Sequence, residues 1–321
     1  LSHQLVASLF ARSFQNPILQ PLDDSAVISA GGVNWAFTTD SYVVTPIFFP
    51  GGDIGRLAVC GTVNDLSTSG AQPRFLSAGF IIEEGFLFAD LQRIVDSMQE
   101  TAVEAGVQIV TGDTKVVNRG AADGVFINTA GIGLIPPGIH ISGRNARPGD
   151  RVLVSGTMGD HGVAILSARE GLEFSTTLVS DCAPLNHLVE KMIAVSPHIH
   201  CLRDPTRGGL SSTLNELARQ SGVGIWVEEN RIPVKEEVRG ACELLGFEPW
   251  ILANEGKLVA IVAQDDAARV LREMKDHPLG RDAAIIGEVR EEPRGKVVLR
   301  TSIGSTRLLD MMVGEPLPRI C

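Results

Sequence analysis

The chain has 321 residues, of which 44% are apolar and 21% charged, enough apolar material for about two globular domains. A formal net charge of −10 argues against a nucleic-acid partner, although it allows phosphate ligands held by backbone N–H groups and Mg²⁺. Five scattered cysteines without a CxxC pair predict neither a zinc site nor a disulfide framework, so we expect a reducing, cytoplasmic location. No apolar run is long enough to predict a membrane helix.

The first half of the sequence predicts strands that alternate with helices, as in an α/β domain. Apolar spacing over residues 3–14 predicts a short amphipathic helix, and Gly31-Gly32 predicts a turn. Residues 35–45 are expected to form a strand that is interrupted at Asp40, and Asp53 is expected to cap the next helix. The remaining elements expected in this half are strand 75–82, helix 91–105, strand 107–110 and strand 125–135.

Proline and glycine clusters near residues 136–150 predict a domain boundary. We therefore expect an N-terminal domain over 1–147, a C-terminal α/β domain over 148–303 and a flexible tail over 304–321. The second domain is expected to begin with strand 151–155 and a glycine-rich turn that contains His161, the histidine in the most plausible functional context. Its other expected elements are helix 182–195, a helix after 204–210, strands near 225–227, 258–262, 284–289 and 296–299, and helices near 235–245 and 266–275.

Aspartates recur beside glycine or threonine at the expected ends of elements. Several converging carboxylates repel one another unless a cation neutralises them, and Mg²⁺ accepts such oxygen ligands. With Lys115 and Arg207 in the same motifs, the set predicts a site for Mg²⁺ and a triphosphate, although the chain has no P-loop. The alternative is that each aspartate caps a helix or closes a turn. The aspartates concerned are Asp23, Asp24, Asp40, Asp65, Asp113 and Asp204.

Two further segments carry candidate chemistry. Glu255, in the polar segment 254–257, is a candidate general base, and its alternative role is a loop carboxylate paired with Lys257. The chain ends on Cys321, and Pro316 and Pro318 favour an extended tail with a reactive thiol at its tip. The alternative is a frayed terminus that happens to end on cysteine. We expect the other cysteines to be buried and inert: Cys60, Cys182, Cys201 and Cys242.

Together these motifs resemble a known superfamily. Four segments resemble the ATP-binding superfamily of aminoimidazole ribonucleotide synthetase, selenophosphate synthetase and thiamine-monophosphate kinase. These segments are 23–27, 64–70, 111–114 and 204–210. Within it, the chain resembles the HypE family of carbamoyl dehydratases in four more specific segments: 48–52, 112–117, 254–257 and the terminal 316–321. The resemblance extends over essentially the whole chain.

The resemblance implies an α/β (α+β) fold of two domains, with the first domains of a homodimer forming a shared β-barrel and ATP bound at the interface. It also implies a reaction. The carbamoyltransferase HypF places a carbamoyl group on the thiol of Cys321, and the protein uses ATP to dehydrate this S-carboxamide to an S-cyanate. The cyanide then passes to iron on the HypC–HypD complex, for the centre of nickel–iron hydrogenase.

The resemblance also implies roles for the residues. Lys115 would stabilise charge on the transferred phosphoryl group, Glu255 would take the amide proton, and Cys321 would carry the substrate. Mg²⁺ would be held by Asp24, Asp40, Asp65, Asp113 and Asp204. ATP would contact Asp24, Asp40, Thr111, Gly112, Asp113 and Arg207.

Two other functions remain open at this stage. A small-molecule kinase or ligase of the same superfamily would not need Cys321, and a non-catalytic scaffold that docks partners through its thiol would not need ATP. Members of the family usually carry a glycine-rich N-terminal segment that folds over the nucleotide. The sequence starts at Leu1, after the expected position of that segment, so we expect ATP turnover to be impaired without it.

Overall fold

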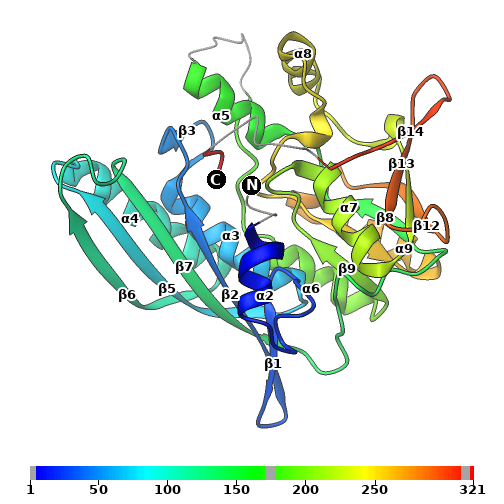
Figure 1. The fold of residues 1–321 in the computed structure, drawn as a ribbon, viewed down its shortest axis with the longest axis horizontal. Coiled ribbons are helices and arrows are strands. Elements are labelled where there is room, and N and C mark those ends of the chain that lie inside the picture. The colour runs from blue at the N-terminus through cyan, green and yellow to red at the C-terminus, as the bar shows by residue number, and fades with distance from the viewer. Residues whose placement is uncertain (1–4, 171–177, 312–318) are drawn as a thin grey trace.

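The computed structural model describes residues 5–170, 178–311 and 319–321, and these form two α/β units side by side (Figure 1). Each unit is built on its own sheet, so the expectation of a two-domain mixed fold is confirmed. Pro316 and Pro318, on which the expectation of an extended tail rests, lie outside the described residues. No helix in the described part of the chain is both long and apolar enough to span a membrane.

The first sheet has five strands in the order β1-β2-β7-β5-β6. Its neighbours pair antiparallel except β5 and β6, which run parallel. Gly31 and Gly32 both have positive φ and form the two-residue hairpin turn between β1 and β2, as expected. The strands are β1 (Ala26–Ala30), β2 (Val33–Tyr42), β5 (Gln72–Glu83), β6 (Gln108–Val117) and β7 (Val125–Ile135). A separate two-stranded ribbon joins β3 (Phe48–Phe49) to β4 (Gly52–Asp53).

Two helices pack against this sheet, α3 (Ile54–Thr68) and α4 (Phe88–Ala105). The Asp53 side chain accepts hydrogen bonds from the backbone N–H groups of Gly55 and Arg56, so the predicted cap of α3 is confirmed. α3 contacts β2 and β7 of the first domain, and it also contacts α6 (Asn186–Val195) and β9 (Ile199–Arg203) of the second domain. Almost every residue of α3 is therefore buried, and the helix links the two domains.

The second sheet has seven strands in the order β14-β13-β10-β12-β8-β11-β9. Helices cover both faces, with α7 on one side and α6 and α9 on the other. The strands are β8 (Arg151–Val154), β9 (Ile199–Arg203), β10 (Gly224–Glu228), β11 (Val259–Val262), β12 (Ala284–Arg290), β13 (Lys296–Arg300) and β14 (Thr306–Leu308). The α-helices are α5 (Asp160–Glu170), α6 (Asn186–Val195), α7 (Gly209–Ser221), α8 (Glu236–Leu245) and α9 (Gln264–Lys275). Short 3₁₀ turns are η2 (Glu229–Arg231), η3 (Pro249–Ile251) and η4 (Pro278–Gly280).

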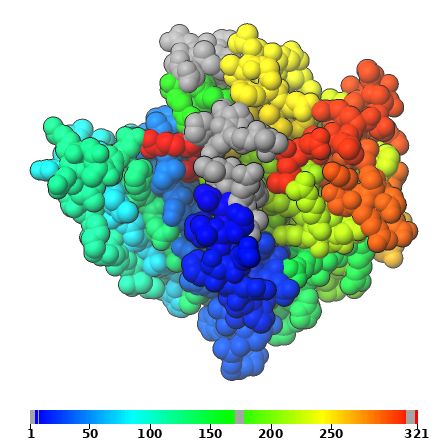
Figure 2. All heavy atoms as spheres, in the orientation of Figure 1, coloured from blue at the N-terminus to red at the C-terminus, as the bar shows by residue number. Residues whose placement is uncertain are grey.

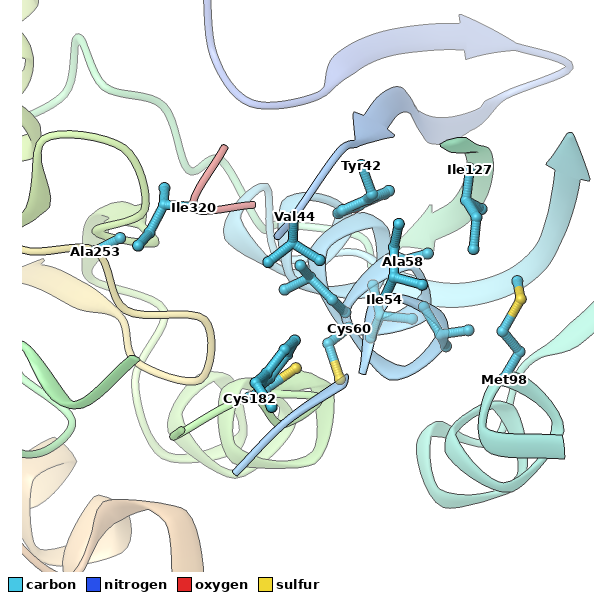
Figure 3. Packing of buried hydrophobic residues seen from close by; sticks show 14 of the residues in the cluster. Tyr42, Val44, Ile54, Ala58, Cys60, Met98, Ile127, Cys182, Ala253 and Ile320 are labelled. Atoms are coloured by element: carbon cyan, nitrogen blue, oxygen red, sulfur yellow. The ribbon is translucent and has the colours of Figure 1, made fainter. Parts of the chain in front are cut away.

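One apolar core extends from the first domain into the second. Figure 3 shows Val44, Ile54 and Cys60 in the same cluster as Ala253 and Ile320. Ile320 is only 3% exposed although it is the penultimate residue, and burying an isoleucine side chain contributes about 1.5–3 kcal/mol. The end of the chain is therefore packed between the two domains, where Figure 1 places the C-terminus.

The N-terminal segment begins with η1 (Val6–Phe10), one turn of π-helix, which continues into α2 (Ala11–Ser13). The helix expected over residues 3–14 is present, although residues 1–4 lie outside the described part. Figure 2 shows this segment, in dark blue, across the middle of one face between the two halves. Several of its apolar side chains, including Leu9, Phe10 and Phe14, are exposed there.

Two local expectations about strands were wrong. β2 is continuous through Asp40, and β6 does not end at Val110 but continues to Val117, so that Asp113 lies inside a strand. Gly112 explains the second difference. A glycine in a strand pattern often indicates the end of the strand. Here, however, a Cβ at this position would lie 2.1 Å from the carbonyl oxygen of Ala78. The glycine thus permits a close approach of β6 to β5 rather than ending β6.

Candidate active site

Three aspartates that are distant in sequence converge where the two domains meet. Asp24 lies two residues before β1, Asp65 lies in the last turn of α3, and Asp204 follows β9. One carboxylate oxygen from each lies within 4.8 Å of the others. The Thr38 hydroxyl lies 2.9 Å from both a carboxylate oxygen of Asp65 and the backbone carbonyl of Asp24. We call Asp24, Asp65 and Asp204 the acidic cluster.

The acidic cluster is electrostatically costly without a cation. Burial, and then repulsion from Asp24, raises the pKa of Asp204 to about 8. Burial and repulsion from Asp204 and Asp24 also raise the pKa of Asp65 well above its usual value. Mg²⁺ binds oxygen ligands, carboxylates among them, so the three convergent carboxylate oxygens of the cluster fit this ion.

A buried arginine accompanies the cluster. Arg203, the last residue of β9, lies 3.1 Å from Asp24 and 2.8 Å from Glu216, and it donates a hydrogen bond to the Leu22 carbonyl. The ion pair with Asp24 fixes one side of the cluster while leaving the oxygens of Asp65 and Asp204 to other partners. Sequence reasoning missed Arg203, although an arginine that ends a short, largely apolar strand next to Asp204 is a usable signal.

Glu255 lies in a closely packed loop beside the cluster. Its side chain is 3% exposed, and its Oε1 atom has no hydrogen-bond partner among the described residues. Lys257 pairs with Asp181 at 3.5 Å, so the described structure does not contain the Glu255–Lys257 pair of the alternative interpretation. Burial, and then repulsion from Cys182 and Asp204, raises the pKa of Glu255 well above its usual value. A carboxylate with a raised pKa accepts a proton more readily than an ordinary glutamate, as a general base must.

Glycine at position 256 is required by the packing of this loop. A Cβ there would lie 1.7 Å from the carbonyl oxygen of Asp181. The same segment is held by Asn254, which is fully buried and accepts a hydrogen bond from the backbone N–H of Gly159. The backbone of the segment thus fixes where the Glu255 side chain points.

The terminal residues are bound in this site. The backbone N–H of Val43 donates to a terminal oxygen of Cys321 at 3.1 Å, and that of Thr45 donates to the Arg319 carbonyl at 3.2 Å. The Cys321 Sγ atom lies 3.3 Å from a guanidinium nitrogen of Arg207. Burial, followed by repulsion from Glu255, raises the pKa of the Cys321 thiol to about 12. The docked thiol is therefore neutral, near Arg207 and within the electrostatic field of Glu255.

Asp40 and Arg207 also belong to this site. The charge of Asp40 contributes to the raised pKa of Asp65, Asp204 and Glu255, so Asp40 on β2 faces the acidic cluster. Arg207 is in the loop before α7, where Gly209 has a φ of +58° and a Cβ would lie 2.5 Å from the Leu252 carbonyl. Glycine is thus required for the close turn that presents Arg207 to the tail.

Asp113 and Lys115 lie elsewhere. They pair with each other at 2.7 Å on β6, with side chains 71% and 68% exposed. β6 lies three strands from β2, which corresponds to about 14 Å at about 4.8 Å per strand. Thr111 and Gly112 are exposed on the same strand. Within one chain, therefore, Asp24, Asp40, Asp65, Asp204, Arg207, Glu255 and Cys321 gather at one site, and the residues of β6 do not join them.

The fold and site define a class of protein, the AIR synthase-related proteins. Residues 22–135 match the family described as "AIR synthase related protein, N-terminal domain", and residues 147–300 match the corresponding C-terminal domain. The chain is 56% identical over 318 residues to a carbamoyl dehydratase HypE from Azotobacter vinelandii, covering 99% of this chain and 93% of that protein.

Solved structures agree with this assignment. A crystal structure of a HypE–HypF complex matches 96% of this chain and 99% of that chain, with a TM-score of 0.92 and 52% identity. A HypE structure in complex with ATP matches 100% of this chain and 96% of that chain, with a TM-score of 0.88 and 53% identity. The chain therefore belongs to the HypE family of carbamoyl dehydratases, as the sequence motifs predicted.

Proposed function

We propose that this protein dehydrates a carbamoyl group carried on Cys321 to a thiocyanate at the expense of ATP, providing cyanide for the iron of nickel–iron hydrogenase. The observation that carries the proposal is the docked terminus. The Cys321 thiol lies 3.3 Å from Arg207 and within the electrostatic field of Glu255 and Asp40. A group attached to this sulfur would be held between a candidate base and a candidate phosphate site.

In the proposed reaction, ATP converts the amide oxygen into a leaving group. The amide oxygen of the S-carboxamide takes the γ-phosphoryl group, an O–P bond forms, and ADP leaves. The C–O bond then breaks with release of phosphate, and the amide nitrogen gives up both of its protons to leave the C≡N group. Phosphorylation is needed because an amide oxygen is otherwise a poor leaving group. ATP thus removes the elements of water, and the C–S bond to Cys321 persists throughout.

Glu255 is our candidate for the base that takes an amide proton. Its free Oε1 atom and raised pKa match that role, and the packing around Gly256 holds it in place. Arg207 beside the thiol is placed to bind either the phosphate or the developing negative charge near the sulfur. Cys321 holds the substrate and need not act as a nucleophile in this step.

The phosphate-binding residues also fit the proposal. A HypE relative has been solved in complex with ATP, and Asp24, Asp40, Asp65 and Asp204 of this chain gather where its two domains meet. We propose that Asp24, Asp65 and Asp204 hold Mg²⁺, which when bound neutralises charge on the phosphate oxygens. Asp40 faces the cluster from β2 and would complete the ligand set.

Asp113 and Lys115 require a second copy of the chain. β6 is an edge strand, and it also exposes the apolar side chains of Val110 and Val116. An open edge of this kind pairs readily with another strand. We propose that the first domains form a homodimer with a shared barrel, in which β6 presents Thr111, Gly112, Asp113 and Lys115 to the site of the partner chain.

The remaining parts of the function concern partners and location. A HypE relative has been solved in complex with HypF, which supports HypF as the protein that loads the carbamoyl group on Cys321. We further propose that the cyanide passes to iron on the HypC–HypD complex, and that the reaction runs in the cytoplasm, where thiols stay reduced.

Intact-mass spectrometry tests the proposal. Protein carbamoylated by HypF should lose about 18 Da, one water, when Mg·ATP is added and not when ATP alone is added with a chelator. Peptide mapping should place the loss on the C-terminal peptide, and Cys321→Ala should acquire neither the carbamoyl group nor the later mass loss. Dehydration that persists in Cys321→Ala would contradict the proposal. So would a carbamoylated protein that keeps its mass with Mg·ATP. A kinase or ligase acting on a small molecule would instead keep its ATP turnover in Cys321→Ala.

A further inference from the structure

The terminal peptide has a side-chain partner that the proposed chemistry does not use. His161, the second residue of α5, is fully buried. Its Nε2 atom lies 2.8 Å from the carbonyl oxygen of Ile320, and its Nδ1 atom lies 2.8 Å from the Ser180 hydroxyl. The ring also packs edge-on against Phe49 at a centroid distance of 5.5 Å. The imidazole therefore connects the second domain to the residue before Cys321.

The hydrogen-bond partners determine the tautomer of the ring. A carbonyl oxygen can only accept, so Nε2 carries the proton and donates it to Ile320. The Ser180 Oγ atom already accepts from the backbone N–H of Cys182 at 3.1 Å, which leaves its own proton for Nδ1. Burial lowers the pKa of His161, which agrees with a neutral ring in this position. The three groups form one continuous, directed chain of hydrogen bonds.

This chain fixes the backbone from which the thiol projects. The carbonyl oxygen of Ile320 and the amide nitrogen of Cys321 belong to one planar peptide unit, so holding the oxygen orients that plane. On the other side of Cys321, the backbone N–H of Val43 holds a terminal oxygen at 3.1 Å. With both sides of its Cα fixed, the side chain of Cys321 keeps only rotation about χ1 for placing Sγ beside Arg207.

Other contacts hold the residue before this peptide. Arg169 donates to the carbonyl oxygens of Arg319 and Thr45, each at 2.8 Å, and the Arg319 guanidinium pairs with Asp123. These contacts anchor the tail but do not touch the peptide that joins Ile320 to Cys321. His161 differs from them because it donates a hydrogen bond to the Ile320–Cys321 peptide itself.

We propose that His161, oriented by Ser180, is a positioning residue that fixes the Ile320–Cys321 peptide and so aligns the group carried on Cys321 for dehydration. The proposal rests on the proposed function for its catalytic consequence, although the docking contact itself does not depend on any reaction. A misplacement of about 1 Å at a reacting centre is enough to slow a reaction by about a hundredfold. The loss of a single hydrogen bond to a backbone carbonyl is therefore enough to change the reaction rate.

Substitutions at two positions test the proposal. His161→Leu removes both hydrogen bonds at similar size, whereas His161→Gln keeps a donor for Ile320 and an acceptor for Ser180. Ser180→Ala removes only the orienting hydroxyl, and it serves as the milder variant if His161→Leu melts at a much lower temperature. His187→Leu is the matched control, since His187 is half-exposed on α6 and contacts the Glu104 carbonyl, not the tail.

The first measurement is the rate at which iodoacetamide alkylates Cys321 in unmodified protein without nucleotide, with the labelled peptide identified by mass. We expect the rate to rise about tenfold in His161→Leu, because loss of one hydrogen bond releases the tail more often. Ser180→Ala should give a smaller rise, and His161→Gln and His187→Leu should stay within about twofold of wild type. An unchanged rate in folded His161→Leu and Ser180→Ala would overturn the proposal.

The second measurement is the single-turnover dehydration rate of carbamoylated protein. We expect the maximal rate to fall at least tenfold in His161→Leu and to recover in His161→Gln, with the half-saturating ATP concentration changed less than about twofold. A loss confined to ATP affinity, or an equal loss in His161→Gln, would contradict a positioning role. If wild-type protein did not dehydrate while alkylation still rose in His161→Leu, the docking contact would stand and the proposed function would fail instead.

Discussion

The acidic cluster and the Asp113–Lys115 pair contain the same kinds of side chain in opposite environments. Asp24, Asp65 and Asp204 converge within 4.8 Å, and burial raises the pKa of each. Repulsion from the other members of the cluster adds to the shift for Asp65 and Asp204, whereas Asp24 is repelled by Glu216 and Asp23. Asp113 is 71% exposed on an edge strand, and its hydrogen bond with Lys115 lowers its pKa. The cluster is thus assembled within one chain, whereas the pair on β6 points away from it.

This difference separates two ways of building a site. Residues held at a domain junction are brought together by the fold of one chain, and α3 provides that junction here because it is buried between both domains. Residues on an open sheet edge become part of a site only through a second molecule. The following predictions test whether the two groups of residues differ in this way.

Asp65→Asn is expected to have the largest effect. It removes one of three convergent carboxylates, so the dehydration rate should fall at least about a hundredfold. Because the raised pKa of Asp65 means that its charge is disfavoured in the fold, the neutral variant should melt at a higher temperature than wild type without divalent cations. Mass spectrometry and thermal melting check the two parts.

Asp266→Asn is the matched control for that variant. Hydrogen bonds from Ser196 lower the pKa of Asp266, so its charge is favoured in the fold, and the substitution should lower the melting temperature slightly. Dehydration should be unaffected because Asp266 lies in the first turn of α9, where its partners are Ser196, His198 and Arg269 and not the residues of the site. If Asp65→Asn behaved like Asp266→Asn in both measurements, the acidic cluster would not be the phosphate site.

The next prediction asks whether Lys115 acts in the partner's site. Lys115→Ala and Asp65→Asn should each be inactive as homodimers. In a mixed dimer, one site receives both altered residues and the other receives none, so one of the two sites is intact. Random pairing makes about half of the dimers mixed, and co-expressed variants should therefore recover about a quarter of wild-type activity.

Complementation would not occur if both residues served the same chain. Each site of a mixed dimer would then contain one altered residue, and the co-expressed proteins would stay as inactive as either homodimer. Purification through two different tags isolates the mixed species, which should show about half of the wild-type activity under the shared-site arrangement. In the shared-site arrangement the purified mixed dimer is therefore about twice as active as the co-expressed mixture. If both residues serve the same chain, both preparations are inactive.

The sequence singled out several residues that the fold brings together, but it did not predict where each of them lies. Asp24, Asp65 and Asp204 could be singled out because carboxylates beside small residues are rarely needed for packing. The expectation that all the aspartates lie at element ends was wrong for Asp40 and Asp113, which lie inside strands. Local patterns do not specify strand order, so nothing in segment 108–117 revealed that β6 is a sheet edge. The contact between His161 and Ile320 joins residues 159 positions apart, and only the tertiary fold brings them together.

Gly112→Ala should have an intermediate effect on stability. The added Cβ would lie 2.1 Å from the Ala78 carbonyl oxygen, so β6 must move away from β5, and we expect a loss of about 1–3 kcal/mol in the free energy of unfolding. Gly240→Ala in α8 is the control, since its Cβ meets nothing within 4 Å and alanine should be neutral or stabilising there. Equal results for the two variants in urea denaturation would contradict a packing role for Gly112.

Asp113→Asn should have the smallest effect on stability and still abolish activity. Its ion pair with Lys115 is exposed to solvent, and such pairs contribute little, so the melting temperature should change by less than about 1 °C. The dehydration rate should nevertheless fall as strongly as in Lys115→Ala, because the carboxylate is proposed to serve the partner's site. Asp96→Asn is a suitable control, since Asp96 is also exposed in the first domain but lies on α4, where it accepts a hydrogen bond from Gln92. A fall in activity that tracked a fall in melting temperature would assign Asp113 to the stability of β6 and remove it from the shared site.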